Sequence, residues 1–482
     1  MRKFHFTIII SFLTANLSLA QNCDCNSNFE WVKKTFEEND AGFQYIIDKK
    51  GEAAYHIHNQ LILEKIKTAK TLKECTYIIK EWSKFFRTGH FGIGILTPKT
   101  PDTNTSQNVT QTVQEAETWK VDIPQFEKYI SKKKEVDFEG IWEIGNYKVG
   151  IKKEGVNYIG FIIESSVDTW KPKHVKLKIE ENGGKLKSTY YMRDHSPDEC
   201  GEPLLIENNY LQLGRWTLKR LQPIFPTDPF VENYFNAMDA KKPYLEELNA
   251  TTLYLRIPSF GMKEKDAIDS VITANTDIIS RTENLIIDLR NNGGGSSNSF
   301  NELLPFLYTN PTRMTGIEFL STKQNNQRFL DFATNDEFNE ETRQWYKESY
   351  DELQKKLGEF VNLGETAIHI NSLDTIYEYP KHVGIIIHKE NGSATEHFIL
   401  IAKQSKKVKL FGTTTYGAFD ISNMYSIKSP CEEFELRYAL SRNMSMYEMP
   451  IDDIGFQPDY FLDKSIPPYK WVEFVNEILN GK

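Results

Sequence analysis

The segment "ENLIIDLRNNGGGSSNSF", residues 283–300, joins a short apolar run to three consecutive glycines. The bulky residues over 285–287 predict a strand that is buried on both faces, which is typical of a parallel sheet. From 291 to 295 the backbone can adopt conformations that most residues avoid, and it can present N–H groups with no side chain in front of them. Such a loop suits a negative group, either a phosphate or the oxyanion of a reacting carbonyl. An ordinary strand-to-helix turn is the alternative.

Length and composition indicate a multidomain globular protein. A chain of 482 residues is long enough for two or three domains. Charged residues make up 26% and hydrophobic residues 39%, which are the values of an ordinary soluble protein. The formal net charge of -9 argues against nucleic acid as a partner.

The first twenty residues have the pattern of a secretory signal peptide. Arg2 and Lys3 precede the apolar stretch 4–13, and small residues at Ser18 and Ala20 predict cleavage after Ala20. No later segment is apolar for the roughly 18 residues that a membrane span needs. We therefore expect a soluble mature protein in the periplasm or outside the cell.

The cysteines fit an oxidising compartment. Either Cys23 or Cys25 is placed to pair with Cys75 and tie the N-terminus to a helix, and the odd total of five leaves at least one thiol free. No C-x-x-C or H-x-x-x-H pair accompanies them, so we expect neither a metal nor a cofactor.

Hydrophobic periodicity divides the chain into segments with different predicted secondary structure. Apolar residues at helical spacing come first, a polar stretch follows, and short alternating strands then suggest an antiparallel barrel or sandwich. Near residue 250 the pattern changes to alternating strands and helices, which indicates an α/β layer with mainly parallel pairing. The predicted parts are a signal peptide (1–20), an N-terminal helical domain (21–98), a linker (99–135), an inserted β module (136–222), a catalytic α/β domain (246–465) and a C-terminal helix (466–482).

A serine stands at a second strand-to-helix junction. The strand "VGIIIH", residues 383–388, is followed by "KENGSATEHFILIA", in which Ser393 heads an apolar helix. A serine placed there can project its hydroxyl, and the N–H of Ala394 can point to a developing oxyanion. The alternative is that Ser393 only caps the helix. The G-x-S-x-G elbow of α/β-hydrolases is absent, since Thr395 replaces its second glycine.

Four elements together resemble the tail-specific or C-terminal processing serine peptidases, and more closely their tricorn-like branch. They are "LIIDLRNNGGG", "NGSATE", "GTTTYGA" and "IGFQPD", and they follow the order of that family over roughly 250–465. The resemblance implies a crotonase-type α/β core, Ser393 as the nucleophile of a peptidase, and Gly294 and Ala394 as oxyanion donors. A phosphate site is disfavoured, because no Lys-Ser/Thr follows the glycines.

The sequence departs from that family where many members carry a lysine as general base, because Ala418 occupies the position. The tricorn-like branch uses a histidine instead, and "RTGHFGI" implies His90, held by Asp452 near the C-terminal motif. Glu448 and Asp453 are less favoured holders, and His397 is a less favoured base. A serine needs such a base to become a nucleophile.

The middle of the chain also differs from the family. Residues 138–221 show no carboxylate-binding glycine loop of the kind that a PDZ module uses. We therefore expect a secreted serine peptidase with a polypeptide substrate and a different β module. The alternative is a binding protein that has kept the fold and lost turnover.

Overall fold

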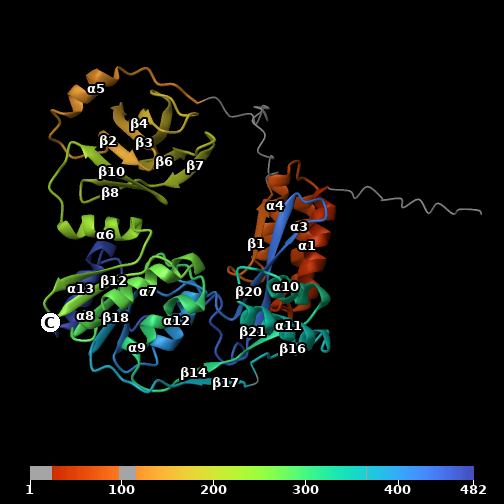
Figure 1. Cartoon of the computed structure of the whole chain (residues 1–482). Helices are drawn as coiled ribbons and strands as arrows, with labels where there is room; N and C mark the ends of the chain where they lie inside the picture. The colour runs from red at the N-terminus through yellow and green to blue at the C-terminus, as the bar shows by residue number, and fades with distance from the viewer. Residues whose placement is uncertain (1–23, 97–115, 365, 482) are drawn as a thin grey trace, which may run out of the picture. The chain divides into compact units, whose positions relative to one another are not determined.

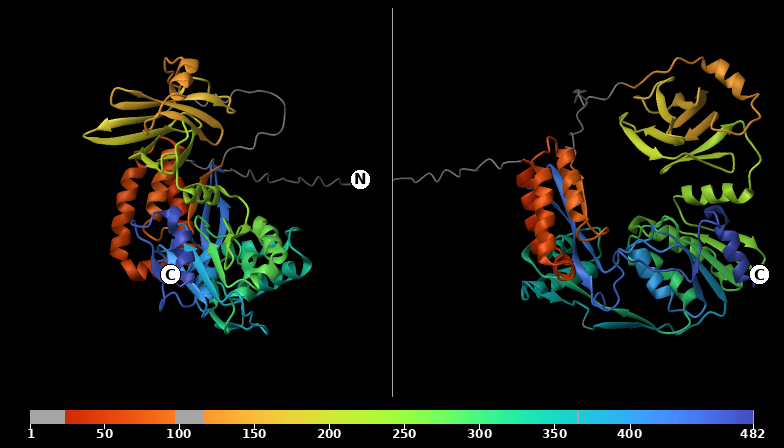
Figure 2. Two further views of the ribbon diagram at one scale, coloured as in Figure 1. Left: turned by 90° about the vertical axis from the view of Figure 1, so that its left-hand side faces the viewer. Right: turned by 180° about the vertical axis from the view of Figure 1, so that it is seen from behind.

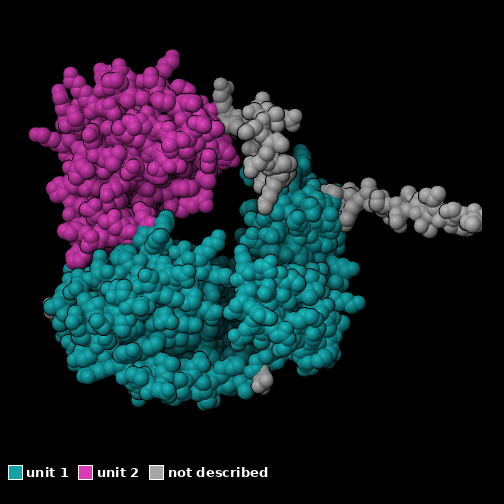
Figure 3. Space-filling view, in the orientation of Figure 1, with its two compact units in different colours: residues 1–99, 240–467, 471–482 teal, residues 100–239, 468–470 magenta. Residues whose placement is uncertain are grey.

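The computed structural model describes residues 24–96, 116–364 and 366–481, and its contacts divide the chain into two compact units (Figure 3). One unit combines residues 1–99, 240–467 and 471–482, and the other combines 100–239 and 468–470. The predicted signal peptide, 1–20, lies outside the described residues. Among the described residues, no helix is both long and apolar enough to cross a membrane.

A six-stranded mixed sheet forms the centre of the first unit (Figure 1). The five strands from β12 onward are parallel and β11 is antiparallel to β12. In spatial order they are β11 (Tyr244–Asn249), β12 (Thr252–Arg256), β13 (Asn284–Asp288), β18 (His382–Ile387), β19 (Val408–Gly412) and β22 (Tyr460–Phe461). The mainly parallel sheet predicted for the catalytic domain is thus present.

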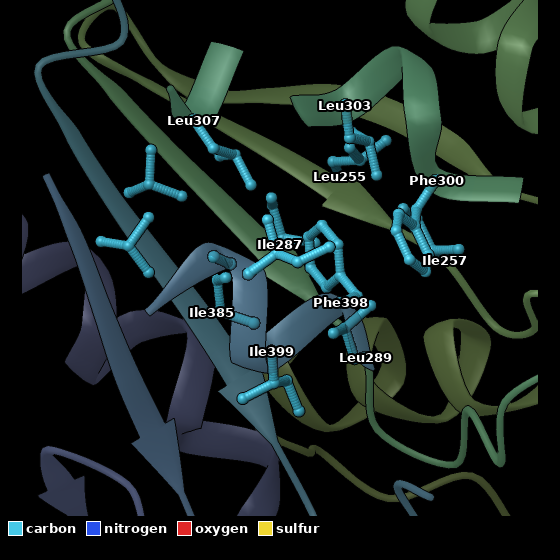
Figure 4. Close-up of a cluster of buried hydrophobic side chains, with 14 of the residues drawn as sticks. Leu255, Ile257, Ile287, Leu289, Phe300, Leu303, Leu307, Ile385, Phe398 and Ile399 are labelled. Atoms are coloured by element: carbon cyan, nitrogen blue, oxygen red, sulfur yellow. The ribbon is translucent and has the colours of Figure 1, made fainter. Parts of the chain in front are cut away.

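Helices cover both faces of this sheet, which explains the unbroken apolar run in β13. Leu285 and Ile287 pack into a core with residues of α7 (Lys265–Ala274), α9 (Leu304–Leu307) and α12 (Ala394–Ala402), part of which Figure 4 shows. Ile286 faces the other side and packs with residues of α13 (Trp471–Leu479). Because successive side chains point to opposite faces, a strand buried on both sides has to be apolar at every position.

The N-terminal helices are part of the first unit and not a separate domain. Their core includes side chains from β15 and β21, far along the chain, and β1 pairs with β21. These elements are α1 (Cys25–Asn39), α2 (Phe43–Lys50), α3 (Glu52–Ile66), α4 (Leu72–Ser83), β1 (Gly92–Ile95), β15 (Ile317–Leu320), α10 (Lys323–Ala333), α11 (Glu340–Gln354), β16 (Phe360–Val361), β20 (Ile421–Lys428) and β21 (Phe434–Asn443). Helices fill most of 25–83 within the predicted N-terminal helical domain, 21–98, but they share their core with chain from 317–443. A disulfide joins Cys25 to Cys75, and Cys200 carries a free thiol.

The second unit is built on a curled antiparallel sheet of nine strands (Figure 2). The strands are β2 (Gly140–Ile144), β3 (Tyr147–Glu154), β4 (Asn157–Ser165), β5 (Val175–Asn182), β6 (Lys185–Tyr191), β7 (Pro197–Gly201), β8 (Leu204–Ile206), β9 (Tyr210–Leu213) and β10 (Trp216–Gln222). Helix α5 (Ile123–Ile130) lies within the segment predicted as a linker, 99–135. Its residues Phe126 and Ile130 are buried against this sheet, so this part of the segment belongs to the folded unit. Helix α6 (Pro229–Asp239) follows the last strand.

Candidate active site

Ser393 occupies the N-cap position of α12 but does not cap it. Its side chain makes no capping hydrogen bond, and its backbone has φ 54° and ψ -123°. The Ser393 N–H donates to the carbonyl oxygen of Ala418 at 2.8 Å. A non-glycine residue in this region of φ and ψ is strained by about 1–3 kcal/mol, and such strain clusters at functional sites. The interpretation of Ser393 as a simple helix cap is therefore wrong.

The hydroxyl of Ser393 faces a cavity of about 670 Å³, which His90 and His397 also line. Within the described residues, Ser393 Oγ has no hydrogen-bond partner. The structure therefore brings the predicted nucleophile and both candidate bases, which are far apart in sequence, to one space.

The glycine-rich loop is held rigidly against Ser393. Asn292 Oδ1 accepts hydrogen bonds from the Gly294 N–H at 3.1 Å and from Thr395 Oγ1 at 2.8 Å. Asn391 Nδ2 donates to the carbonyl oxygens of Leu289 and Asn292. Both asparagines are fully buried, so two strand ends are joined by satisfied amide groups.

Close approach explains why a glycine is needed at 294. A Cβ there would lie 2.9 Å from Ser393 Cβ and 3.0 Å from the Ala394 nitrogen, and φ of Gly294 is +106°. Only a residue without a side chain adopts this conformation in this space.

The geometry favours Gly295 over Gly294 as the first oxyanion donor. The Gly294 N–H is already bonded to Asn292, whereas Gly295 and Ala394 line the cavity beside Ser393. Among the described residues, no acceptor is found for the N–H of Gly295 or of Ala394. Two such donors beside a nucleophile match the requirements of an oxyanion site.

His90 is held in one tautomer by the main chain. Its Nδ1 lies within hydrogen-bond distance of the carbonyl oxygen of Ile421. Because a carbonyl only accepts, Nδ1 carries the proton and Nε2 is left as the basic nitrogen. Burial lowers the pKa of His90 below its usual 6.5, and the nearby charge of Asp452 opposes that lowering. The ring is therefore neutral at physiological pH and able to accept a proton.

The turn that carries His90 is tied down on both sides. Arg87 forms a buried bidentate ion pair with Asp40 and also donates to the carbonyl oxygen of His90 at 2.9 Å. Thr88 donates its N–H and its hydroxyl to Asp453 Oδ1, at 3.1 and 2.8 Å. Asp453 thus binds the turn next to His90 and not the imidazole itself.

Asp452 contacts His90 through the backbone of Ile421, whereas the sequence suggested a direct contact. Its carboxylate accepts the backbone N–H groups of Phe419, Asp420 and Ile421, at 2.6, 2.7 and 3.2 Å. The group that holds the imidazole among the described residues is the Ile421 carbonyl. Asp452 orients the residue that orients His90, and burial raises the pKa of its own carboxyl.

Asp420 and Asp452 each accept the backbone N–H of the other. Asp420 Oδ2 accepts the N–H groups of Ile451 and Asp452, at 2.5 and 2.8 Å. The carboxylates of buried Asp420 and half-buried Asp452 therefore hold the segments 419–421 and 451–452 together. Burial and the neighbouring charge of Asp452 raise the pKa of Asp420 to about 6.

The position of Ala418 explains why a lysine is absent there. A Cβ added to Gly89 would come within 2.5 Å of Ala418 Cβ, so the turn before His90 packs directly on this methyl group. A lysine side chain at 418 would compete with the His90 turn for the same space.

Glu396 fixes the loop that positions Ser393. Its buried carboxylate accepts hydrogen bonds from Thr415 Oγ1 at 2.5 Å and from the N–H groups of Gly417 and Ala418 at 2.8 and 2.7 Å. Ala418 in turn accepts the Ser393 N–H. Burial raises the pKa of Glu396.

His397 lies on the cavity wall with one nitrogen already engaged. Its Nδ1 is 2.8 Å from Ser297 Oγ, and its ring packs near Phe300 and Phe419. Burial lowers its pKa to about 4. The Nδ1 contact with Ser297 and the lowered pKa both make His397 a weak base.

Sequence reasoning missed the residues that support the site, above all Asn292, Asn391 and Asp420. The two asparagines each follow the end of a buried strand, in "RNNGG" and "KENGS", and asparagine there commonly bonds nearby backbone. That signal was available, but the pairing across a hundred residues was not. No group of side chains able to hold a metal ion is found among the described residues.

Comparison with known proteins places this geometry in context. Residues 251–462 match the family model described as Peptidase family S41. No protein with a curated description matches the chain. Mature CPAF complexed with lactacystin is similar to this chain with a TM-score of 0.51 and 12% identity, over 95% of this chain and 99% of that one. Mature CPAF alone gives 0.50 and 12%, over 94% and 96%.

The tricorn protease is less similar, with a TM-score of 0.41 and 13% identity over 95% of this chain and 36% of that one. At such identities the similarity to CPAF shows a shared fold alone.

Proposed function

We propose that this chain, whose residues 251–462 match the model of Peptidase family S41, is a serine peptidase that hydrolyses peptide bonds through an acyl-enzyme on Ser393. In this proposal His90 is the general base, and the N–H groups of Gly295 and Ala394 bind the oxyanion. The tricorn-like assignment, with a histidine in place of a lysine, belongs to the same proposal.

The reaction begins when Nε2 of His90 takes the hydroxyl proton of Ser393 while Oγ bonds to the substrate carbonyl carbon. The carbonyl oxygen becomes negative and accepts hydrogen bonds from Gly295 and Ala394. His90 then gives its proton to the leaving amine as the C–N bond breaks. A water molecule then attacks the ester carbonyl carbon while Nε2 of His90 takes a proton from it. His90 returns that proton to Ser393 Oγ as the ester bond breaks, which releases the acid and restores Ser393.

The imidazolium that forms in each step is stabilised at Nδ1, on the side of the ring opposite the reacting Nε2. The Ile421 carbonyl accepts the Nδ1 proton, and the charge of Asp452 lies close enough to raise the pKa of His90. Asp452 also holds the backbone of Ile421. Its proposed role is therefore to position the carbonyl and to supply negative charge, and not to bind the ring directly.

One observation carries this proposal. A serine in a strained backbone conformation, with a hydroxyl that caps nothing, faces a cavity that also contains a histidine with its Nδ1 proton committed elsewhere. The missing lysine, which favoured a binding protein without turnover, is accounted for by the packing of the His90 turn on Ala418.

We also propose that the mature protein works outside the cytoplasm. The Cys25–Cys75 disulfide is of a kind that persists in oxidising compartments, and residues 1–20 have the pattern of a signal peptide.

The test is hydrolysis of casein by the mature chain and by single variants. We expect Ser393→Ala and His90→Ala to lose roughly 1,000-fold or more in rate, because members of a catalytic unit fail together. His382→Ala is the matched control, since His382 begins the strand that leads to Ser393 and lies on the surface.

The variants separate the candidate bases. Activity that survives His90→Ala but not His397→Ala would transfer the role of base to His397. A wild-type chain that neither cleaves casein nor reacts with a fluorophosphonate at Ser393 would overturn the proposal.

A further inference from the structure

A second cavity, of about 490 Å³, lies next to the catalytic one in the first unit. Helices α9 and α12 and strands β14 (Thr312–Thr315) and β17 (Ile368–Asn371) contribute to its wall (Figure 1). Its apolar lining includes Leu304, Leu307, Ile370, Leu373 and Ile401, and none of the described residues that line it is charged. We call it the apolar cavity.

Two polar side chains at its rim, those of Thr309 and Asn310, already have hydrogen-bond partners. Thr309 Oγ1 donates to Asn310 Oδ1 at 2.7 Å and accepts the Lys406 N–H at 2.9 Å. Asn310 Nδ2 donates to the carbonyl oxygen of Gln404 at 3.3 Å. A polar ligand would find these groups occupied, whereas an apolar side chain would gain by leaving water.

The apolar cavity adjoins the catalytic cavity at the β14–β17 pair. Asn371 lines both spaces. Met314 and His369, which are paired across the two strands, line the catalytic cavity, and Thr312 and Ile370 line the apolar one. A chain that reaches Ser393 along this two-stranded ribbon would therefore pass over the apolar cavity as well.

The separation of the two cavities corresponds to a few residues of extended chain. Helix α12 starts directly after Ser393 and brings Ile401 to the apolar cavity. Eight residues of helix at 1.5 Å each span about 12 Å. An extended peptide covers about 3.3 Å per residue, so the same distance takes three or four residues.

Strand β17 also offers backbone for such a peptide. Among the described strands it pairs only with β14, so its other edge is open. The side chain of Ile370 on this strand is unusually exposed for its type, at 55%. An extended peptide can add to an open strand edge and place alternate side chains in pockets.

We propose that the apolar cavity is a substrate subsite, which takes a large aliphatic or aromatic side chain three or four residues from the scissile bond. The proposal rests on the function assigned to Ser393, because the position of the apolar cavity beside that site identifies the occupant as an extended polypeptide substrate. The peptidase would then select unfolded segments by an apolar residue at a fixed distance from the cut.

Binding, and not turnover, gives the decisive test. Fluorescently labelled, reduced and denatured casein is titrated with the full Ser393→Ala chain, and with the same chain carrying Ile370→Asp or Leu373→Asp. Both side chains are more than a third exposed, so each aspartate can be accommodated in the fold while it places a charge at the apolar cavity. Ile368→Asp is the matched control, since Ile368 lies on the same strand and lines neither cavity.

We expect Ile370→Asp and Leu373→Asp each to weaken casein binding by about tenfold or more, as expected for the loss of one buried apolar side chain, and Ile368→Asp to leave it within about twofold. Cleavage sites of the wild-type chain, mapped on casein by mass spectrometry, should show one apolar position three or four residues from the cut. Equal binding by all three variants, or cleavage sites without that preference, would overturn the subsite.

The two proposals can fail separately. If casein binding depends on Ile370 but the wild-type chain neither cleaves casein nor reacts with a fluorophosphonate, the subsite stands and the catalytic assignment fails. If Ser393 reacts and casein is cleaved while Ile370→Asp binds as Ile368→Asp does, the catalytic assignment stands and the subsite fails.

Discussion

Replacing Gly294 with alanine tests the central feature of the site, the close approach of the glycine loop to Ser393. The new methyl group would lie 2.6 Å from the Gly392 carbonyl oxygen and 2.9 Å from Ser393 Cβ. Atoms at these distances have to move apart by a few tenths of an ångström, and two of the neighbours are backbone atoms of the segment that carries the nucleophile. The substitution also puts a side chain on a residue with φ +106°.

We expect Gly294→Ala to destabilise the fold by about 1–3 kcal/mol from backbone strain alone. The rate should fall by roughly 100- to 1,000-fold, which is the loss measured when one oxyanion donor is removed, because the shift displaces Ser393 and the Ala394 N–H together. Thermal unfolding measures the first effect, and casein hydrolysis and the rate of fluorophosphonate labelling measure the second.

Gly293→Ala is the matched control at the adjacent position. A methyl group there would meet nothing closer than the Glu390 carbonyl oxygen at 3.8 Å, and Gly293 does not have a positive φ. We expect its stability to stay within about 1 kcal/mol of wild type, since a glycine replaced at a compatible position loses little. If Gly294→Ala keeps activity within threefold of Gly293→Ala, the glycine loop does not lie against the reacting carbon and the reasoning is wrong.

Three further predictions concern charges. Because burial lowers the pKa of His90, the acidic limb of kcat/KM against pH should lie below pH 6.5, and a limb above 7 would contradict this assignment. The pKa of Asp420 is raised to about 6 from its ordinary 3.8, so the folded protein binds this proton more tightly than the unfolded chain and loses stability as pH rises from about 4 to 6. In urea unfolding, Asp420→Asn should remove up to about 3 kcal/mol of that change in the free energy of unfolding. An unchanged dependence of stability on pH would count against this assignment. Arg87→Met leaves the Asp40 carboxylate buried without its partner and should cost about 3–5 kcal/mol in the same unfolding assay, whereas a cost below 1 kcal/mol would show that the pair does not support the His90 turn.

Local sequence was sufficient for those features that depend on neighbours along the chain. The apolar run in β13 and the apolar helix after Ser393 predicted the buried sheet and its covering helix, because burial on both faces leaves no polar position. The strand pattern of the β module was also readable, although α5 was taken as linker because a long polar stretch precedes it.

Other features depended on where distant segments meet. The N-terminal helices looked like a domain of their own, because nothing in residues 21–98 shows that β1 pairs with β21 some 340 residues later. The role expected for Asp452 was shifted by the same kind of contact. Its carboxylate accepts three backbone N–H groups, and the described group that contacts His90 Nδ1 is the Ile421 carbonyl oxygen.

By itself the sequence determined the elements of this protein and the candidates for its chemistry: a glycine loop after a buried strand, a serine before a buried helix, and a histidine beside a small residue. Residue type and short-range periodicity are enough for that, since they follow from burial and from local backbone preference. Only the tertiary structure decided which N–H groups remain free beside Ser393, which atom holds His90, and that an apolar cavity lies beside the catalytic one. Those properties are distances between residues up to several hundred positions apart, and packing of the whole unit sets them.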